Sequence, residues 1–284
     1  ARASSFMPAV TNYLAKDYEA GYQNWACAQG SNGEMYFGNS QGLLVYDGYR
    51  WTLHKVPGNH IVRSVYVKED RIYVGAFEEF GYFKYSEAGT LRYHSLSKFL
   101  KNFPMENNEI WNIVELDGRI YFQSFSAWFS YDGKMVHAFR NRQQQPLYFY
   151  TQNGHIYTQM IDEDFYEFDG KDFLHLFPRS QVNDDNVVAL LPDGDDSFLM
   201  VTENNGLFRY NGDITPWKTD IDAELKKQRV NRAVMTNDSI FMIGTVLNGI
   251  YAIDRKGHCL WHFNLDNRLD NNTVLGLFCD KDNN

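Results

Sequence analysis

One sequence pattern recurs six times along this chain. Residues 33–48 read GEMYFGNSQGLLVYDG, which is an apolar strand, a tight polar turn, a second apolar strand and a closing Asp-Gly turn. The other copies lie at residues 71–85, 119–133, 155–170, 197–212 and 239–254. Asn-Gly and Asp-Gly pairs recur in the copies because hairpin turns need positive φ at their centres. The repetition therefore predicts a chain built from repeated β-hairpins.

The spacing of the copies indicates which class of all-β fold the repeats form. The central apolar residue of each first hairpin strand recurs at intervals of 37, 48, 36, 42 and 42 residues. Each interval also holds a short apolar run before the hairpin and a run of alternating polar and apolar residues after it. Four strand signals in a period of about 40 residues are typical of a β-propeller with four-stranded blades. We therefore predict an all-β propeller.

The repeats also predict how the chain is divided. We expect a lead-in segment at residues 1–22 and a propeller at 23–284, with blades at 23–59, 60–108, 109–145, 146–185, 186–229 and 230–272 and a partial blade at 273–284. The run TVLGLFCDKDNN at 273–284 matches the first strand and turn of a seventh blade. We therefore expect seven blades, either in a piece of a longer protein or in a ring closed by residues 6–22. Short helical insertions are expected at 95–108 and 219–228.

Composition argues against several classes of partner. The formal net charge of −9 at pH 7 disfavours binding to nucleic acid or to an anionic lipid surface. The cysteines Cys27, Cys259 and Cys279 are too few and too scattered for a disulfide framework or a zinc site. No apolar run approaches the roughly 18 residues of a membrane span, and the histidines show no metal-binding spacing. We therefore expect no nucleic-acid partner, membrane segment, metal or cofactor in this chain.

Two patterns could indicate catalysis, and we assign it to neither. Ser40 lies in a G-x-S-x-G motif, but this motif joins two strands, whereas a nucleophile elbow joins a strand to a helix. The acidic turns at Glu78-Glu79 and at 162–164 occupy equivalent places in different repeats, which makes them the best candidates for the paired carboxylates of a glycosidase. Acidic residues in turns are more often solvated, and we predict no catalytic residue.

A ligand-binding face is indicated more strongly by aromatic residues. In a propeller, the turns between second and third strands and the connections into the next first strand share one face. Here these segments combine aromatic residues with Arg and Glu, a mixture that suits a carbohydrate or a protein partner. Packing between blades is the alternative role for each residue. The candidate residues are Trp25, Arg63, Phe77, Glu79, Phe80, Trp111, Phe125, Trp128, Tyr148 and Met160.

The repeats resemble a known family. The strings ENNGLFRYNG (203–212), LNGIYAID (247–254) and NSQGLLVYDG (39–48) are similar to the two-component regulator propeller repeat. That repeat forms the extracytoplasmic sensor regions of Bacteroidetes-type hybrid two-component sensors and of related membrane-spanning transcription regulators. The resemblance covers residues 18–284 and is weakest at 109–145 and 146–186, where the Asn-Gly pair before the third strand is missing.

The resemblance implies a function and a location. It implies the first propeller of a periplasmic sensor that regulates transcription, with an oligosaccharide as ligand and with other domains of the same sensor, or a second copy, as partners. Two alternatives remain open: a secreted propeller enzyme, lyase or hydrolase, that acts on polysaccharide, and a protein-interaction scaffold. No signal peptide is visible, and the sequence starts without Met.

Overall fold

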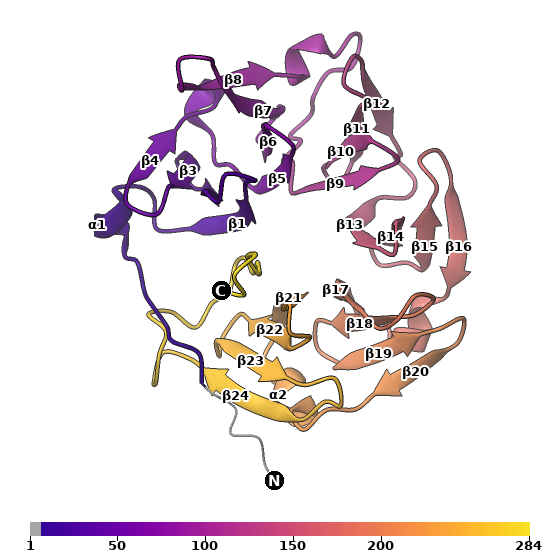
Figure 1. Ribbon diagram of the computed structural model, residues 1–284. Coiled ribbons are helices and arrows are strands. Elements are labelled where there is room, and N and C mark those ends of the chain that lie inside the picture. Colours follow the sequence, from indigo (N-terminus) through magenta and orange to yellow (C-terminus); the bar gives the residue numbers. More distant parts are fainter. Residues whose placement is uncertain (1–6) are drawn as a thin grey trace. The chain divides into compact units, whose positions relative to one another are not determined.

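The computed structural model describes residues 7–284, and these form two compact units. The four-blade unit comprises Leu14–Phe177, and the two-blade unit comprises residues 7–13 and Pro178–Asn284. Every blade is a four-stranded antiparallel sheet whose strands follow one another in the chain, as Figure 1 shows. The predicted all-β propeller with four-stranded blades is therefore confirmed.

Four sheets make up the four-blade unit, and three short helices lie between or before their strands. The strands are β1 (Asn24–Gln29), β2 (Met35–Asn39), β3 (Gly42–Tyr46), β4 (Trp51–His54), β5 (Ser64–Lys68), β6 (Arg71–Ala76), β7 (Glu79–Tyr85), β8 (Leu91–Ser95), β9 (Asn112–Leu116), β10 (Arg119–Gln123), β11 (Ala127–Tyr131), β12 (Val136–Arg140), β13 (Pro146–Gln152), β14 (His155–Met160), β15 (Phe165–Phe168) and β16 (Phe173–Phe177). The helices are α1 (Ala15–Tyr18) and the 3₁₀ turns η1 (Pro57–Asn59) and η2 (Ser97–Phe99).

Two sheets make up the two-blade unit. Their strands are β17 (Val187–Pro192), β18 (Phe198–Thr202), β19 (Leu207–Tyr210), β20 (Ile214–Trp217), β21 (Val230–Met235), β22 (Phe241–Thr245), β23 (Ile250–Ile253) and β24 (Cys259–Phe263). The 3₁₀ turn η3 (Arg179–Val182) precedes β17, and α2 (Asp222–Leu225) connects β20 to β21.

The Asp-Gly turns explain why the hairpins repeat. In three blades, an Asp carboxylate accepts hydrogen bonds from the backbone N–H groups two and three residues later: Asp47, Asp132 and Asp169. The Gly that follows each Asp has positive φ, for example 93° at Gly133. A side chain that bonds its own turn and a residue that tolerates positive φ are together a strong turn signal. These turns set the register between the third and fourth strands.

Apolar side chains of neighbouring blades interlock to form the core. Between the second and third blades, Phe80 of β7 packs against Phe122 of β10 and Phe129 of β11, with ring centroids 4.7 and 4.9 Å apart. Such aromatic pairs add to the stabilisation from apolar burial. The second and third strands of the blades are the most buried, whereas first strands such as β1 and β5 are mostly half-buried. The core therefore lies mainly between the second and third strands of neighbouring blades.

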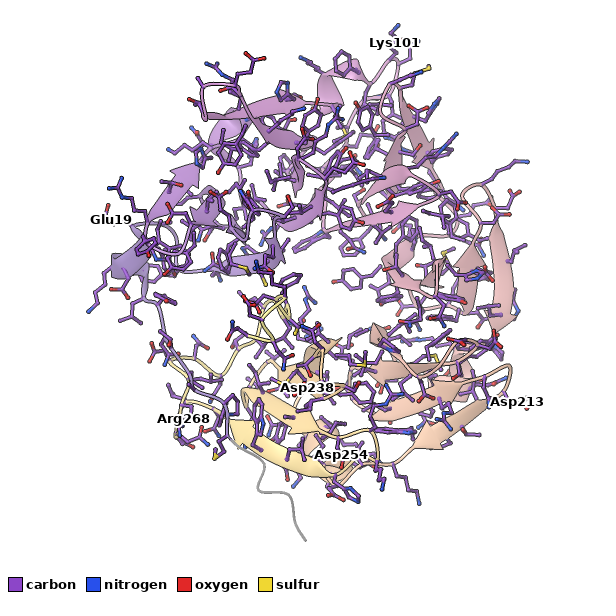
Figure 2. The ribbon with its side chains drawn as sticks, in the orientation of Figure 1. Glu19, Lys101, Asp213, Asp238, Asp254 and Arg268 are labelled. Carbon is purple, nitrogen blue, oxygen red and sulfur yellow. The ribbon has the colours of Figure 1, made fainter. Side chains whose placement is uncertain are left out.

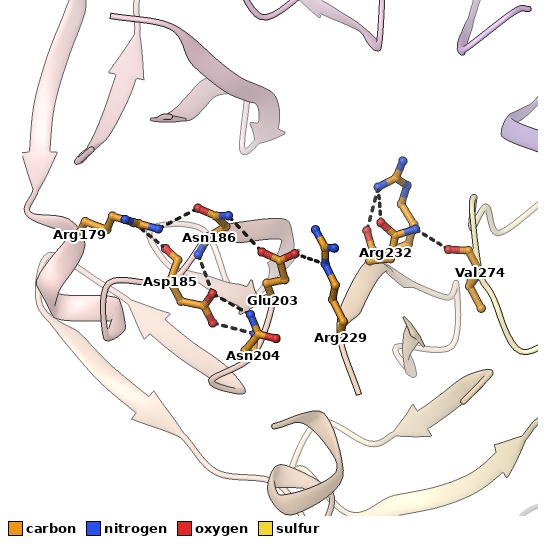
Figure 3. A network of polar contacts seen from close by, with 9 residues as sticks. Arg179, Asp185, Asn186, Glu203, Asn204, Arg229, Arg232 and Val274 are labelled. Atoms are coloured by element: carbon orange, nitrogen blue, oxygen red, sulfur yellow. Dashed lines mark hydrogen bonds and ion pairs between the residues drawn. The ribbon is translucent and has the colours of Figure 1, made fainter. Parts of the chain in front are cut away.

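A small residue at the end of the second strand allows the next blade to approach. A Cβ on Gly38 would lie 2.7 Å from the Val62 carbonyl oxygen, and a Cβ on Gly244 would lie 2.5 Å from the Val274 side chain. Side-chain donors then bond the incoming backbone: Asn112 Nδ2 donates to Phe149 O at 2.6 Å. Asn231 Nδ2 donates to Val274 O, also at 2.6 Å, and Figure 3 shows the bond to Val274. The same contact thus repeats in both units.

The structure does not support the expected seventh blade. The described residues form six blades, and residues 273–284 contain no strand. Val274 N donates to Thr245 O, as Val62 N donates to Asn39 O where the second blade begins. The segment therefore enters as a first strand would, but no second strand pairs with it, and a strand exists only as part of a hydrogen-bonded ladder. The expectation of seven blades is therefore not supported by the described residues.

The segments outside the sheets also differ from expectation. The predicted insertion at 95–108 contains only the single turn η2, and 219–228 contains the short helix α2. The lead-in contains α1, and its residues 1–6 lie outside the described residues. Exposed charged side chains such as Lys101 and Asp213 extend away from the sheets in the loops that carry them (Figure 2).

Candidate ligand-binding site

Three of the predicted site residues occupy the same repeat position in successive blades. Trp25, Arg63 and Trp111 each directly precede the residue that pairs with Gly38, Gly75 or Gln123 on the second strand. In the four-blade unit, β1, β5 and β9 are neighbours (Figure 1). Equivalent positions on neighbouring first strands bring the three side chains together, so the repeat itself builds this cluster.

The guanidinium of Arg63 contacts two indole rings. Its central carbon is 4.1 Å from the Trp25 ring centroid and 4.7 Å from the Trp111 ring centroid. The two indoles contact each other edge to face, with centroids 6.4 Å apart. A cation near an aromatic face is attracted by the ring quadrupole, and here two faces share one cation. We name Trp25, Arg63, Glu109 and Trp111 the arginine cluster.

Glu109 supplies the negative charge of the arginine cluster. Its Oε1 lies 3.5 Å from Arg63 Nε, and the two side chains are 24% and 14% exposed. Nevertheless, four buried polar atoms of this cluster have no hydrogen-bond partner among residues 7–284: Nε and Nη1 of Arg63, Oε2 of Glu109 and Nε1 of Trp25. Buried polar atoms in native proteins nearly always have a partner, so a group of four is unusual.

Further aromatic rings extend the arginine cluster across the third and fourth blades. Trp111 stacks on Phe125 with centroids 6.0 Å apart, and Phe125 contacts Tyr148 edge to face at 5.9 Å. Tyr148 in turn contacts Tyr150 at 6.3 Å. Trp111, Phe125 and Tyr148 are half-buried, so each keeps part of its ring accessible. We name Trp25, Trp111, Phe125 and Tyr148 the aromatic ladder.

Two other predicted residues have protein partners of their own. Phe77 forms an isolated backbone bridge with Glu109 and packs against His60 with ring centroids 5.5 Å apart. Glu79 accepts hydrogen bonds from Tyr93 Oη at 2.7 Å and from Ser95 Oγ at 2.8 Å. Burial, and then the charge of Glu79, raise the pKa of Tyr93. Phe77 therefore borders the arginine cluster through Glu109, and Glu79 is engaged by the fourth strand of its own blade.

The remaining three predicted residues are core residues. Phe80, Trp128 and Met160 are 0%, 4% and 0% exposed. Trp128 packs against Phe139 and Phe149. Packing between blades, the alternative considered for each candidate, is what the structure shows for Phe80 and Trp128, and Met160 is fully buried. Aromatic content in a hairpin turn does not by itself distinguish a ring that faces the next blade from one that faces solvent.

Sequence reasoning missed Glu109 and His60. Glu109 lies two residues before Trp111, in the connection that leads into β9, and His60 lies in the connection that leads into β5. Both segments were recognised as part of the candidate face. The prediction relied on aromatic residues. The acidic residue Glu109 beside Trp111 was the signal in the sequence that could have completed the cluster.

A second group of charges lies in the two-blade unit, around two buried carboxylates. Asp185 accepts hydrogen bonds from the backbone N–H groups of Asn186 and Asn204, at 2.8 and 2.7 Å, and from Asn205 Nδ2 at 2.9 Å. Glu203 accepts from Asn186 Nδ2 at 3.1 Å and from Arg229 Nε (Figure 3). We name these residues, with Arg179, the carboxylate network. Asp185 is only 7% exposed.

The side chains weighed for catalysis are engaged elsewhere. Ser40 Oγ donates to the Gln23 carbonyl at 3.2 Å. Glu78 accepts from the Asn107 backbone N–H at 2.7 Å, and Asp164 pairs with His175 at 2.9 Å. Each of these groups therefore has a local structural partner.

The described residues give less support to a metal site, a membrane span or an enclosed pocket. Within residues 7–284, no three His, Cys, Asp or Glu side chains group closely enough to hold a metal ion, and no helix is both long and apolar enough to span a membrane. A cavity of about 130 Å³ lies between the first two blades, beside Tyr36, Asp70, Lys84 and Tyr85. This volume is below the roughly 300 Å³ at which ligand pockets begin. The arginine cluster and the aromatic ladder therefore form the stronger candidate site.

Solved structures share this fold. The chain matches two structures of the extracellular domain of BT4673 from B. thetaiotaomicron, provisionally assigned in one as a one-component and in the other as a hybrid two-component system. Each match has a TM-score of 0.72 and 18% identity over 94% of this chain. Since the match covers 37% of that chain, the present chain spans little more than a third of its length.

More distant propellers match as well. The WD40 β-propeller domain of Doa1 has a TM-score of 0.68 at 10% identity, over 94% of this chain and 88% of that one. The computationally designed protein Ika8 has a TM-score of 0.56 at 13% identity, over 90% and 91%. No protein-family model and no curated protein sequence matches the chain. At these identities, the structural likeness shows that the chain has a β-propeller fold.

Proposed function

We propose that this chain is the extracytoplasmic ligand-recognition propeller of a signal-transducing sensor, that it is non-catalytic and that it responds to glycans. The observation that carries the proposal is the aromatic ladder with the arginine cluster at one end. Half-exposed aromatic rings beside polar groups suit the apolar C–H faces and the hydroxyls of sugars. The similarity of the repeats to the two-component regulator propeller, and of the fold to the extracellular domain of BT4673, supports a sensor.

Signalling in such a protein would follow from differential affinity. A ligand shifts an equilibrium between two arrangements only by as much as it binds one better than the other. In this proposal, the propeller binds the glycan, and the binding free energy changes its contact with other domains of the same sensor or with a second copy. A periplasmic location and an output in transcription belong to the same proposal.

An enzyme is the less favoured alternative. Glycoside hydrolysis needs one carboxyl group positioned as an acid and another as a base or nucleophile. The acidic residues Glu79, Asp164 and Asp185 already accept hydrogen bonds or ion pairs from neighbouring side chains. Because these carboxylates are already engaged, the described geometry favours a binding role over catalysis.

Calorimetry tests this function directly. The full chain is titrated with a panel of neutral, uronate and sulfated oligosaccharides. We expect measurable heat with at least one probe and a loss of that heat in Trp111→Ala. Trp261→Ala is the matched control, because Trp261 is a half-buried indole on β24 of the other unit. Turnover of any probe would contradict the non-catalytic part, and absence of heat with all probes would contradict glycan recognition by this chain.

A further inference from the structure

We infer that the arginine cluster recognises a pair of neighbouring hydroxyl groups on a neutral saccharide and discriminates against uronates and sulfated sugars. The inference rests on the proposed function, because it names the chemical class of ligand at the same site. It goes further by assigning the specificity to one ion pair, Arg63 and Glu109, rather than to the aromatic ladder.

The first step is the hydrogen-bonding capacity of the cluster. Arg63 Nε and Nη1 and Trp25 Nε1 are donors without a hydrogen-bond acceptor among residues 7–284, and Glu109 Oε2 is an acceptor without a donor. A complementary ligand must therefore accept from the guanidinium and the indole and donate to the carboxylate within a few ångströms. A hydroxyl group both donates and accepts, so two neighbouring hydroxyls can meet both requirements.

The second step is the charge. Glu109 Oε1 lies 3.5 Å from Arg63 Nε, so the pair carries no net charge. An anionic ligand that approaches Arg63 would meet the Glu109 carboxylate, and a cationic ligand that approaches Glu109 would meet the guanidinium. Like charges in close contact disfavour binding, and this is how interfaces exclude wrong partners. The formal net charge of −9 acts in the same direction against anions.

The third step is the role of the indoles. Trp25 and Trp111 both contact the guanidinium, and both are half-buried. The unpartnered atoms themselves are enclosed, so a ligand reaches them only when a ring or the arginine moves. Enclosing polar atoms without partners costs free energy, and a ligand that supplies the partners recovers it. The cluster therefore favours opening in the presence of a hydroxyl-rich ligand.

A second arginine in the same blade provides the control. Arg71 also lies over an aromatic ring, with its central carbon 4.4 Å from the Tyr82 centroid, but its Nη1 donates to Tyr131 Oη at 3.3 Å. Arg71 opens β6, beyond the turn that follows β5, whereas Arg63 directly precedes β5. The two arginines thus share a cation–π contact and differ in position and in hydrogen bonding.

The experiment combines calorimetry with tryptophan fluorescence on the full chain. The neutral probes are cello-, malto-, manno- and xylopentaose, and the anionic probes are pentagalacturonate and a heparin-derived oligosaccharide. We expect a neutral probe to bind most tightly and to shift the indole emission. Arg63→Met should weaken that binding at least tenfold, and Arg71→Met should leave it within twofold. Glu109→Gln leaves the Arg63 charge uncompensated, so it should raise the affinity for pentagalacturonate relative to the neutral probe at least tenfold.

The outcomes separate the two proposals. Binding of a neutral probe that is unchanged in both Arg63→Met and Glu109→Gln would overturn this inference and leave glycan recognition standing. The same holds if an anionic probe binds wild type more tightly than every neutral probe. If no probe produces heat, the proposed glycan recognition fails, and the inference fails with it. Because Glu109→Gln is nearly isosteric, it keeps the test decisive if Arg63→Met does not fold.

Discussion

The arginine cluster and the carboxylate network both contain buried charges near connections that lead into first strands. They differ in how those charges are hydrogen-bonded. Asp185 accepts three close hydrogen bonds within its own blade, and Glu203 accepts bonds from Asn186 and Arg229. Arg63 and Glu109 approach each other without a hydrogen bond and leave atoms unpartnered. Networks whose groups are all bonded give rigidity, whereas unbonded groups mark positions retained for another purpose. The carboxylate network therefore has a structural role, and the arginine cluster is the better candidate for a ligand-binding site.

The largest effect should come from Asp185→Asn. This change turns one carboxylate oxygen into an NH₂ group, which then faces an N–H donor of Asn186, Asn204 or Asn205. A buried mismatch of this kind should lower the free energy of unfolding by about 2–3 kcal/mol. Urea unfolding followed by circular dichroism measures it. Asp184→Asn is the matched control because Asp184 is exposed and Asn tolerates its φ of 55°. Equal losses in both variants would contradict the structural role of Asp185.

The double variant Arg63→Met/Glu109→Met should behave differently. Replacing a buried ion pair by apolar side chains of similar size is often neutral or stabilising. Here no hydrogen bond joins the two side chains, so we expect an unfolding free energy within about 1 kcal/mol of wild type, or above it. The same urea series provides the measurement. A loss as large as that of Asp185→Asn would mean that the pair is a structural element like the carboxylate network.

A smaller effect is expected at the edge of the carboxylate network. Arg229 bonds Glu203, but its side chain is 66% exposed. Ion pairs with an exposed partner contribute little, so Arg229→Ala should cost less than about 1 kcal/mol at low salt and less still at high salt. Unfolding curves at two ionic strengths test this. Glu203 keeps its bond to Asn186 in this variant. A loss above about 2 kcal/mol would show that Glu203 depends on Arg229 rather than on Asn186.

The smallest effect concerns the Asp-Gly turns of the four-blade unit. Hydrogen bonds from the backbone N–H groups of Met135 and Lys134 lower the pKa of Asp132. A carboxyl group with a lowered folded-state pKa stabilises the fold above its unfolded pKa of about 3.9, and this contribution is lost as the pH falls through the folded pKa. The difference in stability between wild type and Asp132→Asn should therefore be present at about pH 6 and shrink below about pH 4. A difference that does not change across this range would contradict the assignment.

Much of the fold could be predicted because its signals are local. The Asp-Gly turn at Asp132 is made by a side chain and by backbone groups two and three residues away, so a short string of sequence contains the whole interaction. The seventh blade could not be predicted in this way. Residues 273–284 carry the pattern of a first strand, but a strand also needs a partner, and the partner is not part of the pattern.

The candidate site could be predicted only in part. Trp25, Arg63 and Trp111 meet because they repeat in register, and Phe125 and Tyr148 join them from the third and fourth blades. Phe80, Trp128 and Met160 come from equally aromatic or apolar segments and are buried in the core. Which way a ring points depends on the blade beside it, so the sequence pattern could not separate the two groups.

The sequence by itself determined that this protein consists of repeated four-stranded blades, since turn chemistry and apolar alternation act over a few residues. Only the tertiary structure decided the number of blades and the pairing of charges. Asp185 became a buried, fully bonded carboxylate, and Arg63 became a cation in contact with two indoles without a hydrogen bond to Glu109. Both results depend on contacts between segments that are distant in the chain, and those contacts form only when the strands pack side by side.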